Sequence, residues 1–176
     1  MVVNRTLQAL VPFAAIAIVG CSTMGMGGPS ATAKLEPTKG STASGTATFV
    51  QRGDKVAVNV AVTGLKPNAE HGFHIHEKGD CSSGDGMSTG GHFNPDGKPH
   101  AAPTTPERHV GDLGSLTADA QGTAKASFEL DRMSVAPGPN SIVGKGLIVH
   151  RDPDDYKTQP TGNSGPRIAC GVITAN

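Results

Sequence analysis

The sequence is poor in the features that mark membrane-spanning, helical and nucleic-acid-binding proteins. It has no tryptophan, one tyrosine and five phenylalanines, and its first apolar run, residues 7–19, is only 13 residues long. A transmembrane helix needs roughly 20 apolar residues, so this run is too short to span a bilayer. Lysine and arginine together number 15, as do aspartate and glutamate. Global charge therefore gives no case for binding nucleic acid or an anionic membrane surface, and any attraction for a charged substrate must be local.

The chain is instead rich in turn-forming residues, with 24 glycines and 13 prolines among 176 residues. This composition favours short strands over helices, and the length suits one domain preceded by a leader. The clearest strand carries Val56, Val58, Val60 and Val62 on one face, because side chains two residues apart point the same way. Further strands are predicted at residues 42–50, 70–77, 113–119, 123–130, 141–150 and 167–174. About seven or eight such strands predict an all-β domain, a β-sandwich or Greek-key barrel.

The first 20 residues have the pattern of an export signal. Arg5 lies in a short polar start, the apolar run follows, and Ile18-Val19-Gly20-Cys21 resembles the lipobox of bacterial lipoprotein precursors. In such precursors the cysteine thiol receives a diacylglyceryl group and becomes the new N-terminus. We therefore predict a lipoprotein signal peptide at residues 1–20, a lipidated Cys21 with a flexible tether at residues 21–31, and the domain at residues 32–176. The alternative is ordinary secretory cleavage near Gly20, which would leave Cys21 as a free thiol.

The three cysteines allow three pairings. If Cys21 carries lipid, only Cys81 and Cys170 remain to form a disulfide. Export to an oxidising compartment would permit that bridge.

Two segments, residues 78–111 and 151–166, interrupt the strand pattern. Loops longer than about 12 to 15 residues without structure of their own are usually functional or disordered. Six of the seven histidines lie between residues 71 and 109, in the first segment or just before it. This concentration of metal-binding side chains predicts that the long loops are functional.

The strand at residues 70–77 sorts its histidines by side. His74 and His76 project from one face and can bind one metal together, whereas His71 projects from the other face beside Phe73 and Ile75. We therefore interpret His71 as a hydrogen-bonded structural histidine. A single His-x-His pair has little specificity, so the metal prediction depends on the other histidines.

The long loop supplies the residue types of a zinc site. His109 and Asp112 are close enough in sequence to share an ion within a turn, and two further imidazoles would complete a tetrahedral set of three histidines and one aspartate. The loop offers His92 and His100 for this purpose. Four protein ligands leave no open position, which is typical of a structural zinc rather than a hydrolytic one.

A second site can be assembled from the remaining histidines. His74, His76 and His150 would form an all-nitrogen set with His92, and such a set favours copper over zinc. His92 is then required by both sites. Because an imidazole has two ring nitrogens, His92 can bridge two metals, giving seven ligands for two ions.

These motifs resemble copper/zinc superoxide dismutase, in the exported bacterial form. The resemblance rests on Gly72-Phe73-His74-Ile75-His76-Glu77, Gly91-His92-Phe93-Asn94-Pro95 and the segment from Gly162 to Ile173, and it runs from about residue 32 to the end. It implies a Greek-key β-barrel of eight antiparallel strands, an immunoglobulin-like sandwich with two long functional loops.

The resemblance also implies a role for individual residues. By position, the copper ligands are His74, His76, His92 and His150, and the zinc ligands are His92, His100, His109 and Asp112. Arg167 matches the arginine that attracts and hydrogen-bonds the anion beside the copper. Asp154 matches an aspartate that links a copper histidine to a zinc histidine, with Asp152 and Asp155 as alternatives. Pro160 stands where eukaryotic members carry a lysine, whereas Lys78 resembles a lysine of the bacterial members.

The implied activity is dismutation of superoxide to oxygen and hydrogen peroxide. It would use one copper ion cycling between Cu(II) and Cu(I) and one zinc ion per subunit, with His92 carrying a proton when the copper is reduced. The implied setting is a membrane-anchored lipoprotein that faces the periplasm or the cell exterior and protects the envelope, and a homodimer is compatible with the resemblance. A non-catalytic copper-binding envelope lipoprotein is the alternative function; a missing arginine or a missing fourth copper ligand would favour it, but Arg167 and His150 are both present. A purely structural envelope lipoprotein would leave seven metal-ligand positions unexplained.

Overall fold

The computed structural model describes residues 1–2 and 28–176, and this part of the chain forms eight β-strands and one short 3-10 helix. Residues 3–20 of the predicted signal peptide and most of the predicted tether, including Cys21, lie outside the described residues. The elements are β1 (Ser30–Pro37), β2 (Ser44–Arg52), β3 (Lys55–Thr63), β4 (Glu70–His76), η1 (Met87–Thr89), β5 (Asp112–Thr117), β6 (Ala124–Leu130), β7 (Gly146–His150) and β8 (Arg167–Ala175).

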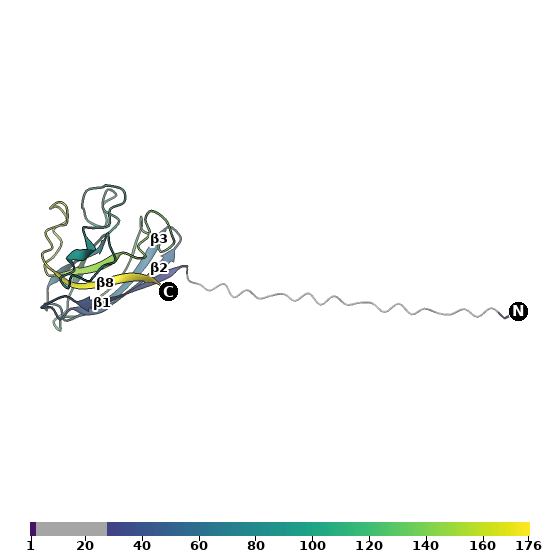
Figure 1. Cartoon of the computed structure of the whole chain (residues 1–176), viewed down its shortest axis with the longest axis horizontal. Coiled ribbons are helices and arrows are strands. Elements are labelled where there is room, and N and C mark those ends of the chain that lie inside the picture. Colours follow the sequence, from purple (N-terminus) through teal and green to yellow (C-terminus); the bar gives the residue numbers. More distant parts are fainter. Residues whose placement is uncertain (3–27) are drawn as a thin grey trace.

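The strands form one antiparallel sheet that curls into a nearly closed barrel. Their order is β5-β4-β7-β8-β1-β2-β3-β6, and the pairing of β1 with β8 joins the two halves (Figure 1). The predicted all-β class and eight-stranded antiparallel Greek-key architecture are therefore confirmed.

The alternating pattern of β3 shows why these sequences form strands. Its four valines are all buried, the most accessible, Val60, at 4% exposure, whereas Asn59 and Ala61 face outward. Inside the barrel the valines meet large side chains of other strands, including Phe49 of β2 and Phe73 of β4. Full burial of one such side chain stabilises the fold by about 1.5 to 3 kcal/mol, so the period-two pattern specifies which face of each strand lies inside.

Several strand boundaries differ from the prediction: β2 spans residues 44–52 rather than 42–50, and β5 spans residues 112–117 rather than 113–119. The strand predicted at residues 141–150 begins only at Gly146, because a turn occupies residues 142–145: the Lys145 N–H donates to the Ile142 carbonyl oxygen at 3.1 Å, and Gly144 has a left-handed φ of 80°. The first strand begins at Ser30, two residues before the predicted start of the domain, because Ser30 already pairs with Val50 of β2.

Both predicted long loops are present, and both return over the outward face of β4. Phe73 and Ile75 of β4 are fully buried in the barrel core, so His74 and His76 point away from it. The loop at residues 77–111 covers these histidines through Gly90, and the loop at residues 151–166 reaches His74 through Asp154. The metal-binding residues therefore lie between the barrel wall and its two longest loops.

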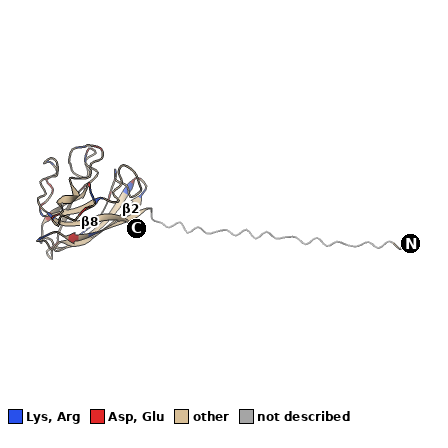
Figure 2. Cartoon of the chain, in the orientation of Figure 1, with Lys and Arg blue, Asp and Glu red and all other residues tan. Residues whose placement is uncertain are grey.

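The outer surface carries charges of both signs. Figure 2 shows lysine and arginine interspersed with aspartate and glutamate over the strands and loops. No helix among the described residues is long and apolar enough to cross a membrane.

Candidate metal centre

Four histidines from β4, β7 and the first long loop converge beside the barrel wall. One ring nitrogen from each of them lies within 4.8 Å of the corresponding nitrogens of the others, and all four side chains are buried. We call this set the four-histidine group; its members are His74, His76, His92 and His150. Backbone pairing explains the convergence. His76 forms an isolated β-bridge with His92 of the loop, and His74 pairs with Ile148 of β7, two residues before His150.

Hydrogen bonds fix which nitrogen each ring of this group presents. His76 Nδ1 donates to the Gly90 carbonyl oxygen at 2.9 Å, and His150 Nδ1 donates to the Gly165 carbonyl oxygen at 3.1 Å. A carbonyl oxygen can only accept, so the Nε2 atom of each neutral ring must carry a free lone pair. His74 is turned the other way: its Nε2 donates to the Asp154 carboxylate at 2.8 Å, which leaves the lone pair on Nδ1.

The nitrogens left free by these bonds are the ones that a metal requires. His74 Nδ1, His76 Nε2, His92 Nε2 and His150 Nε2 are all buried and have no hydrogen-bond partner within residues 1–2 and 28–176. Buried polar atoms are nearly always paired, so four unpaired nitrogens in one cluster need a common explanation. A metal ion bound by all four provides it, and four imidazoles suit copper.

A second cluster gathers around one carboxylate oxygen. Asp112 Oδ1 lies 2.8 Å from His92 Nδ1, 3.0 Å from His100 Nδ1 and 3.2 Å from His109 Nδ1. These four residues, which we call the Asp112 group, are buried and offer three imidazole nitrogens and one carboxylate oxygen. That set fits a tetrahedral structural zinc site.

His92 belongs to both groups. Its Nδ1 faces Asp112, and its Nε2 is the unpaired nitrogen in the four-histidine group. The ring centroids of His92 and His74 are 4.0 Å apart, and those of His92 and His109 are 5.5 Å apart. The geometry therefore fits the sequence-based expectation that one imidazole bridges two metals.

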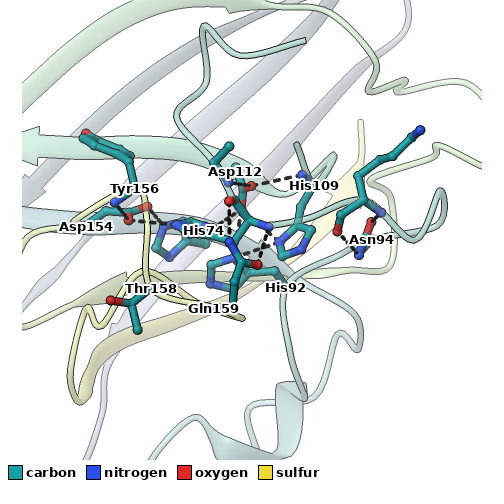
Figure 3. Close-up of polar contacts among 12 residues, drawn as sticks. His74, His92, Asn94, His109, Asp112, Asp154, Tyr156, Thr158 and Gln159 are labelled. Carbon is teal, nitrogen blue, oxygen red and sulfur yellow. Dashed lines mark hydrogen bonds and ion pairs between the residues drawn. The ribbon is translucent and has the colours of Figure 1, made fainter. Parts of the chain in front are cut away.

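The loop at residues 151–166 joins the two groups through Asp154. One carboxylate oxygen of Asp154 accepts a hydrogen bond from His74 Nε2 at 2.8 Å, and the other accepts one from His100 Nε2 at 2.9 Å. Of the three aspartates that the sequence left open, Asp154 makes these contacts, whereas Asp152 pairs with Arg151 and Asp155 binds within its own loop. In Figure 3, Asp154 and Asp112 lie on different sides of the histidines that they contact.

Burial keeps the four-histidine group neutral, whereas hydrogen bonding produces charged side chains in the Asp112 group. Burial lowers the pKa of His92 to about 4 and that of His150 to about 3, so both rings are neutral at pH 7 and keep the lone pairs needed to bind a metal. Burial also lowers the pKa of His100, but hydrogen bonds to Asp112 and Asp154 outweigh it and raise that pKa to about 9. Burial alone would raise the pKa values of the Asp112 and Asp154 carboxyl groups. Hydrogen bonds from histidines instead hold both pKa values far below the ordinary range. Both aspartates are therefore anionic.

Arg167, at the start of β8, is held against the first long loop. Its Nη1 donates to the Gly86 carbonyl oxygen at 2.6 Å and to Thr89 Oγ1 at 2.8 Å, and its Nη2 donates to the Gly90 carbonyl oxygen at 2.7 Å. The Gly90 carbonyl oxygen also accepts the hydrogen bond from His76 Nδ1. Arg167 and a histidine of the four-histidine group therefore share one acceptor. Burial lowers the pKa of Arg167 from its ordinary value, but an arginine keeps its charge at any physiological pH.

Lys78 and the disulfide lie in the same part of the loop. Lys78 is exposed, and its backbone N–H donates to the Thr89 carbonyl oxygen at 3.0 Å. Cys81 and Cys170 form the predicted disulfide, with a Cα–Cα distance of 5.9 Å. The bridge ties this loop to β8, three residues beyond Arg167.

His71 lies outside both groups, as its position on β4 predicted. The residue is buried, and its Nδ1 donates to the His150 carbonyl oxygen at 2.9 Å. His71 therefore supports the strand that carries a metal-binding histidine without reaching the metal groups.

Several residues that support the site were missed in the sequence. Gln159 forms two hydrogen bonds to the backbone of His100, accepting from its N–H at 2.8 Å and donating to its carbonyl oxygen at 2.8 Å. Thr89 accepts a hydrogen bond from Arg167, as do the carbonyl oxygens of Gly86 and Gly90. The Gly90 and Gly165 carbonyl oxygens accept from His76 and His150, respectively. No sequence signal distinguishes these residues, because a backbone carbonyl has no residue type and a loop glutamine belongs to no metal-ligand pattern.

Comparisons with known proteins agree with this geometry. A family model described as copper/zinc superoxide dismutase (SODC) matches residues 43–173. The Superoxide dismutase [Cu-Zn] of Cordyceps militaris is 46% identical over 138 residues, which cover 74% of this chain and 88% of that protein. The protein of the same name from Paramecium bursaria Chlorella virus 1 is 46% identical over 135 residues, covering 73% of this chain and 71% of that one. The crystal structure of the clock protein EA4 is 43% identical with a TM-score of 0.75, and the match covers 82% of this chain and 93% of that chain.

Proposed function

Because this chain belongs to the copper/zinc superoxide dismutase family and is an oxidoreductase acting on superoxide, we propose that one copper ion binds in its four-histidine group and one zinc ion in its Asp112 group. The observation that carries the proposal is a set of four buried histidines that each bring one ring nitrogen within 4.8 Å of the others, and that each have one unpaired ring nitrogen among the described residues. In all four rings the other nitrogen has a hydrogen-bond partner that fixes the ring, so the ligand set is arranged before any metal binds.

Zinc in the Asp112 group has a supporting role. Three imidazoles and one carboxylate would fill a tetrahedral shell and leave no position for a reacting water. His92, held through its Nδ1 in this group, would keep its Nε2 directed at the four-histidine group.

The chemistry divides between the metal and the side chains. Bound copper supplies the one-electron oxidation of one superoxide and the one-electron reduction of a second, so that two superoxide ions and two protons give one oxygen and one hydrogen peroxide. Arg167 attracts the anion and hydrogen-bonds it with the N–H groups that the loop leaves free. His92 Nε2 takes up a proton in one half of the cycle, while its Nδ1 stays in the Asp112 group.

Metal analysis and a superoxide decay assay on the same sample test this function. We expect the full chain to bind about one copper and one zinc ion and to remove superoxide at a rate near the diffusional limit. His150→Ala is the matched control: it should lose copper and activity but keep zinc, since His150 belongs to one group only. A wild-type protein that holds both metals but leaves superoxide decay unchanged would instead support the copper-binding alternative.

We also propose that the protein is exported and anchored to a membrane through lipid on Cys21, facing the periplasm or the cell exterior, where it protects the envelope from superoxide. The lipobox resemblance at residues 18–21 supports the anchor. The Cys81–Cys170 disulfide supports export, because such bridges persist in oxidising compartments.

Detergent-phase partitioning tests the anchor. The wild-type chain should enter the detergent phase, and Cys21→Ser should move to the aqueous phase with unchanged activity. Retention of Cys21→Ser with the membrane would contradict lipidation of this residue.

A further inference from the structure

The hydrogen bonds of Arg167 use up one side of its guanidinium group. Nη1 has two N–H donors, and both are occupied, one by the Gly86 carbonyl oxygen and one by Thr89 Oγ1. Nη2 gives one of its two donors to the Gly90 carbonyl oxygen. The second Nη2 donor and the Nε donor have no protein partner among the described residues, so they are the ones available to an anion.

Thr89 is the only side chain among these three acceptors, and hydrogen bonds fix both the donor and the acceptor direction of its hydroxyl. The residue has 0% exposure. Its Oγ1 donates to the Gly86 carbonyl oxygen at 2.8 Å, which can only accept, and therefore presents a lone pair to Arg167 Nη1 at 2.8 Å. Gly86, Thr89 and the guanidinium group thus form a closed triangle of hydrogen bonds.

The backbone of Thr89 is held as firmly as its side chain. Its N–H donates to the Gly86 carbonyl oxygen at 3.2 Å, and its carbonyl oxygen accepts from the Lys78 N–H at 3.0 Å. The methyl group lies against Gly146 of β7, where an added Cβ would approach Thr89 Cγ2 to 2.8 Å. The hydroxyl therefore has a defined position relative to the barrel and not only within its own turn.

We propose that Thr89 is a positioning residue for superoxide dismutation: its hydroxyl engages one Nη1 donor of Arg167 and so fixes the rotation of the guanidinium group that binds the substrate anion. This inference rests on the proposed role of Arg167. Two backbone carbonyls would still hold the arginine without the hydroxyl, but one Nη1 donor would lack a partner in a partly buried site. The guanidinium group would then turn to satisfy that donor, and the pair of donors facing the anion would lose its orientation.

The test compares three variants loaded with copper and zinc. Thr89→Val keeps the shape of the side chain and removes the hydroxyl, and Thr89→Ser keeps the hydroxyl and removes the methyl group. Thr38→Val is the matched control, because Thr38 Oγ1 donates at 2.7 Å to the backbone carbonyl oxygen of Arg167 and does not touch its guanidinium group. The probe is azide, a small anion whose binding to the copper(II) protein is followed by absorption, alongside the second-order rate with superoxide.

We expect Thr89→Val to weaken azide binding and to slow the superoxide reaction by roughly three- to tenfold, the scale of one net hydrogen bond. Thr89→Ser and Thr38→Val should stay within about twofold of the wild type in both measurements. If Thr89→Val fails to load metal, Thr89→Ala takes its place, since it adds no methyl group at the hydroxyl position. Wild-type azide affinity in the metal-loaded variant that lacks the hydroxyl would overturn the proposal, as would an equal loss in Thr89→Ser.

This outcome is separate from the fate of the proposed function. If the wild-type protein binds both metals but does not remove superoxide, the dismutase proposal fails, whereas the ranking of azide affinities among the variants still decides whether Thr89 orients Arg167.

Discussion

A histidine that binds a metal through one ring nitrogen is oriented by the partner of the other nitrogen. In the four-histidine group, two of these partners are the carbonyl oxygens of Gly90 and Gly165, and one is the Asp154 carboxylate. A backbone carbonyl cannot be altered by substitution and cannot donate, so it enforces one tautomer of the ring. Asp154 orients one histidine of the four-histidine group, His74, and one of the Asp112 group, His100.

The contact between Asp154 and His100 leaves no room for a side chain at position 162, which is a glycine. The residue has a left-handed φ of 68°, and a Cβ at this position would overlap the Asp154 carboxylate and crowd His100 Nε2. We expect Gly162→Ala to break the Asp154–His100 contact and weaken zinc affinity by about 10- to 100-fold, measured by competition with a chelator. Gly53→Ala is the control, since Gly53 has a similar φ of 61° but open space around it. Equal zinc affinity in the two variants would show that crowding at Asp154 has no effect.

Lys78 and Arg167 are the cations that we propose create a local positive field in a chain of zero formal net charge. Lys78→Glu should lower the second-order rate with superoxide at low ionic strength, and the difference should shrink as salt screens the field. Lys125→Glu, on the exposed face of β6, makes the same change in net charge away from the loop that holds Arg167. A rate for Lys78→Glu that equals the wild-type rate in low salt would rule out steering by this lysine.

At the residue scale, the sequence predicts metal ligands better than it predicts their supports. Strand parity separates His71 from His74 and His76 because side-chain direction alternates along any strand. Gln159 and Thr89 could not be found in this way, because their roles depend on segments far apart in the sequence meeting in space.

At the scale of elements, the connection between β6 and β7 fastens the loop of the Asp112 group. Arg132 in this connection donates to Asp96 Oδ2 at 2.7 Å and to the Pro106 carbonyl oxygen. Asp131 beside it accepts from Arg108 at 2.6 Å. These contacts hold both halves of the loop, because Asp96 lies between His92 and His100 whereas Pro106 and Arg108 precede His109.

Arg132→Gln should therefore loosen the Asp112 group without breaking the barrel. An exposed ion pair contributes about 0.2 to 1 kcal/mol, so we expect zinc affinity to fall by roughly two- to fivefold, and high salt to reduce the difference. Arg52→Gln is the control, since Arg52 pairs with Glu129 at 3.6 Å on the barrel surface. An equal effect of both substitutions would mean that the contacts of Arg132 do not reach the zinc ligands.

Seven of the eight strands were predicted from the sequence, because burial inside the barrel demands a period of two; β1 was not among the predicted ranges. The start of β7 was not predictable in this way: Ile142 is buried and apolar, as a strand residue would be, but it contributes to the core from a turn. Apolar character reports burial, and only the left-handed φ of Gly144 and the hydrogen bond from the Lys145 N–H to the Ile142 carbonyl oxygen show that the chain bends there.

At the scale of the whole molecule, one covalent bond links the loop that holds Arg167 to the strand that carries it. Cys81 lies in the loop after β4, and Cys170 lies on β8, three residues after Arg167. The guanidinium group spans the same gap by binding Gly86 and Gly90. The disulfide therefore acts on both the stability of the barrel and the position of the anion-binding arginine.

Replacing both cysteines in Cys81→Ser/Cys170→Ser should separate these two effects. The bridge joins residues 89 apart, for which the chain-entropy model gives a stabilisation of at most about 4 to 5 kcal/mol. Denaturant unfolding of the metal-free protein measures how much unfolding free energy the variant loses. The bridge restricts the unfolded chain, and so this loss should appear in the metal-free protein as well as in the metal-bound one. In the metal-loaded variant at a temperature where it is folded, azide binding should also weaken, because the loop bearing Gly86 and Thr89 is then held to β8 by hydrogen bonds alone. A variant with lower unfolding free energy but wild-type azide affinity would show that hydrogen bonds to Arg167 suffice to hold the loop in place.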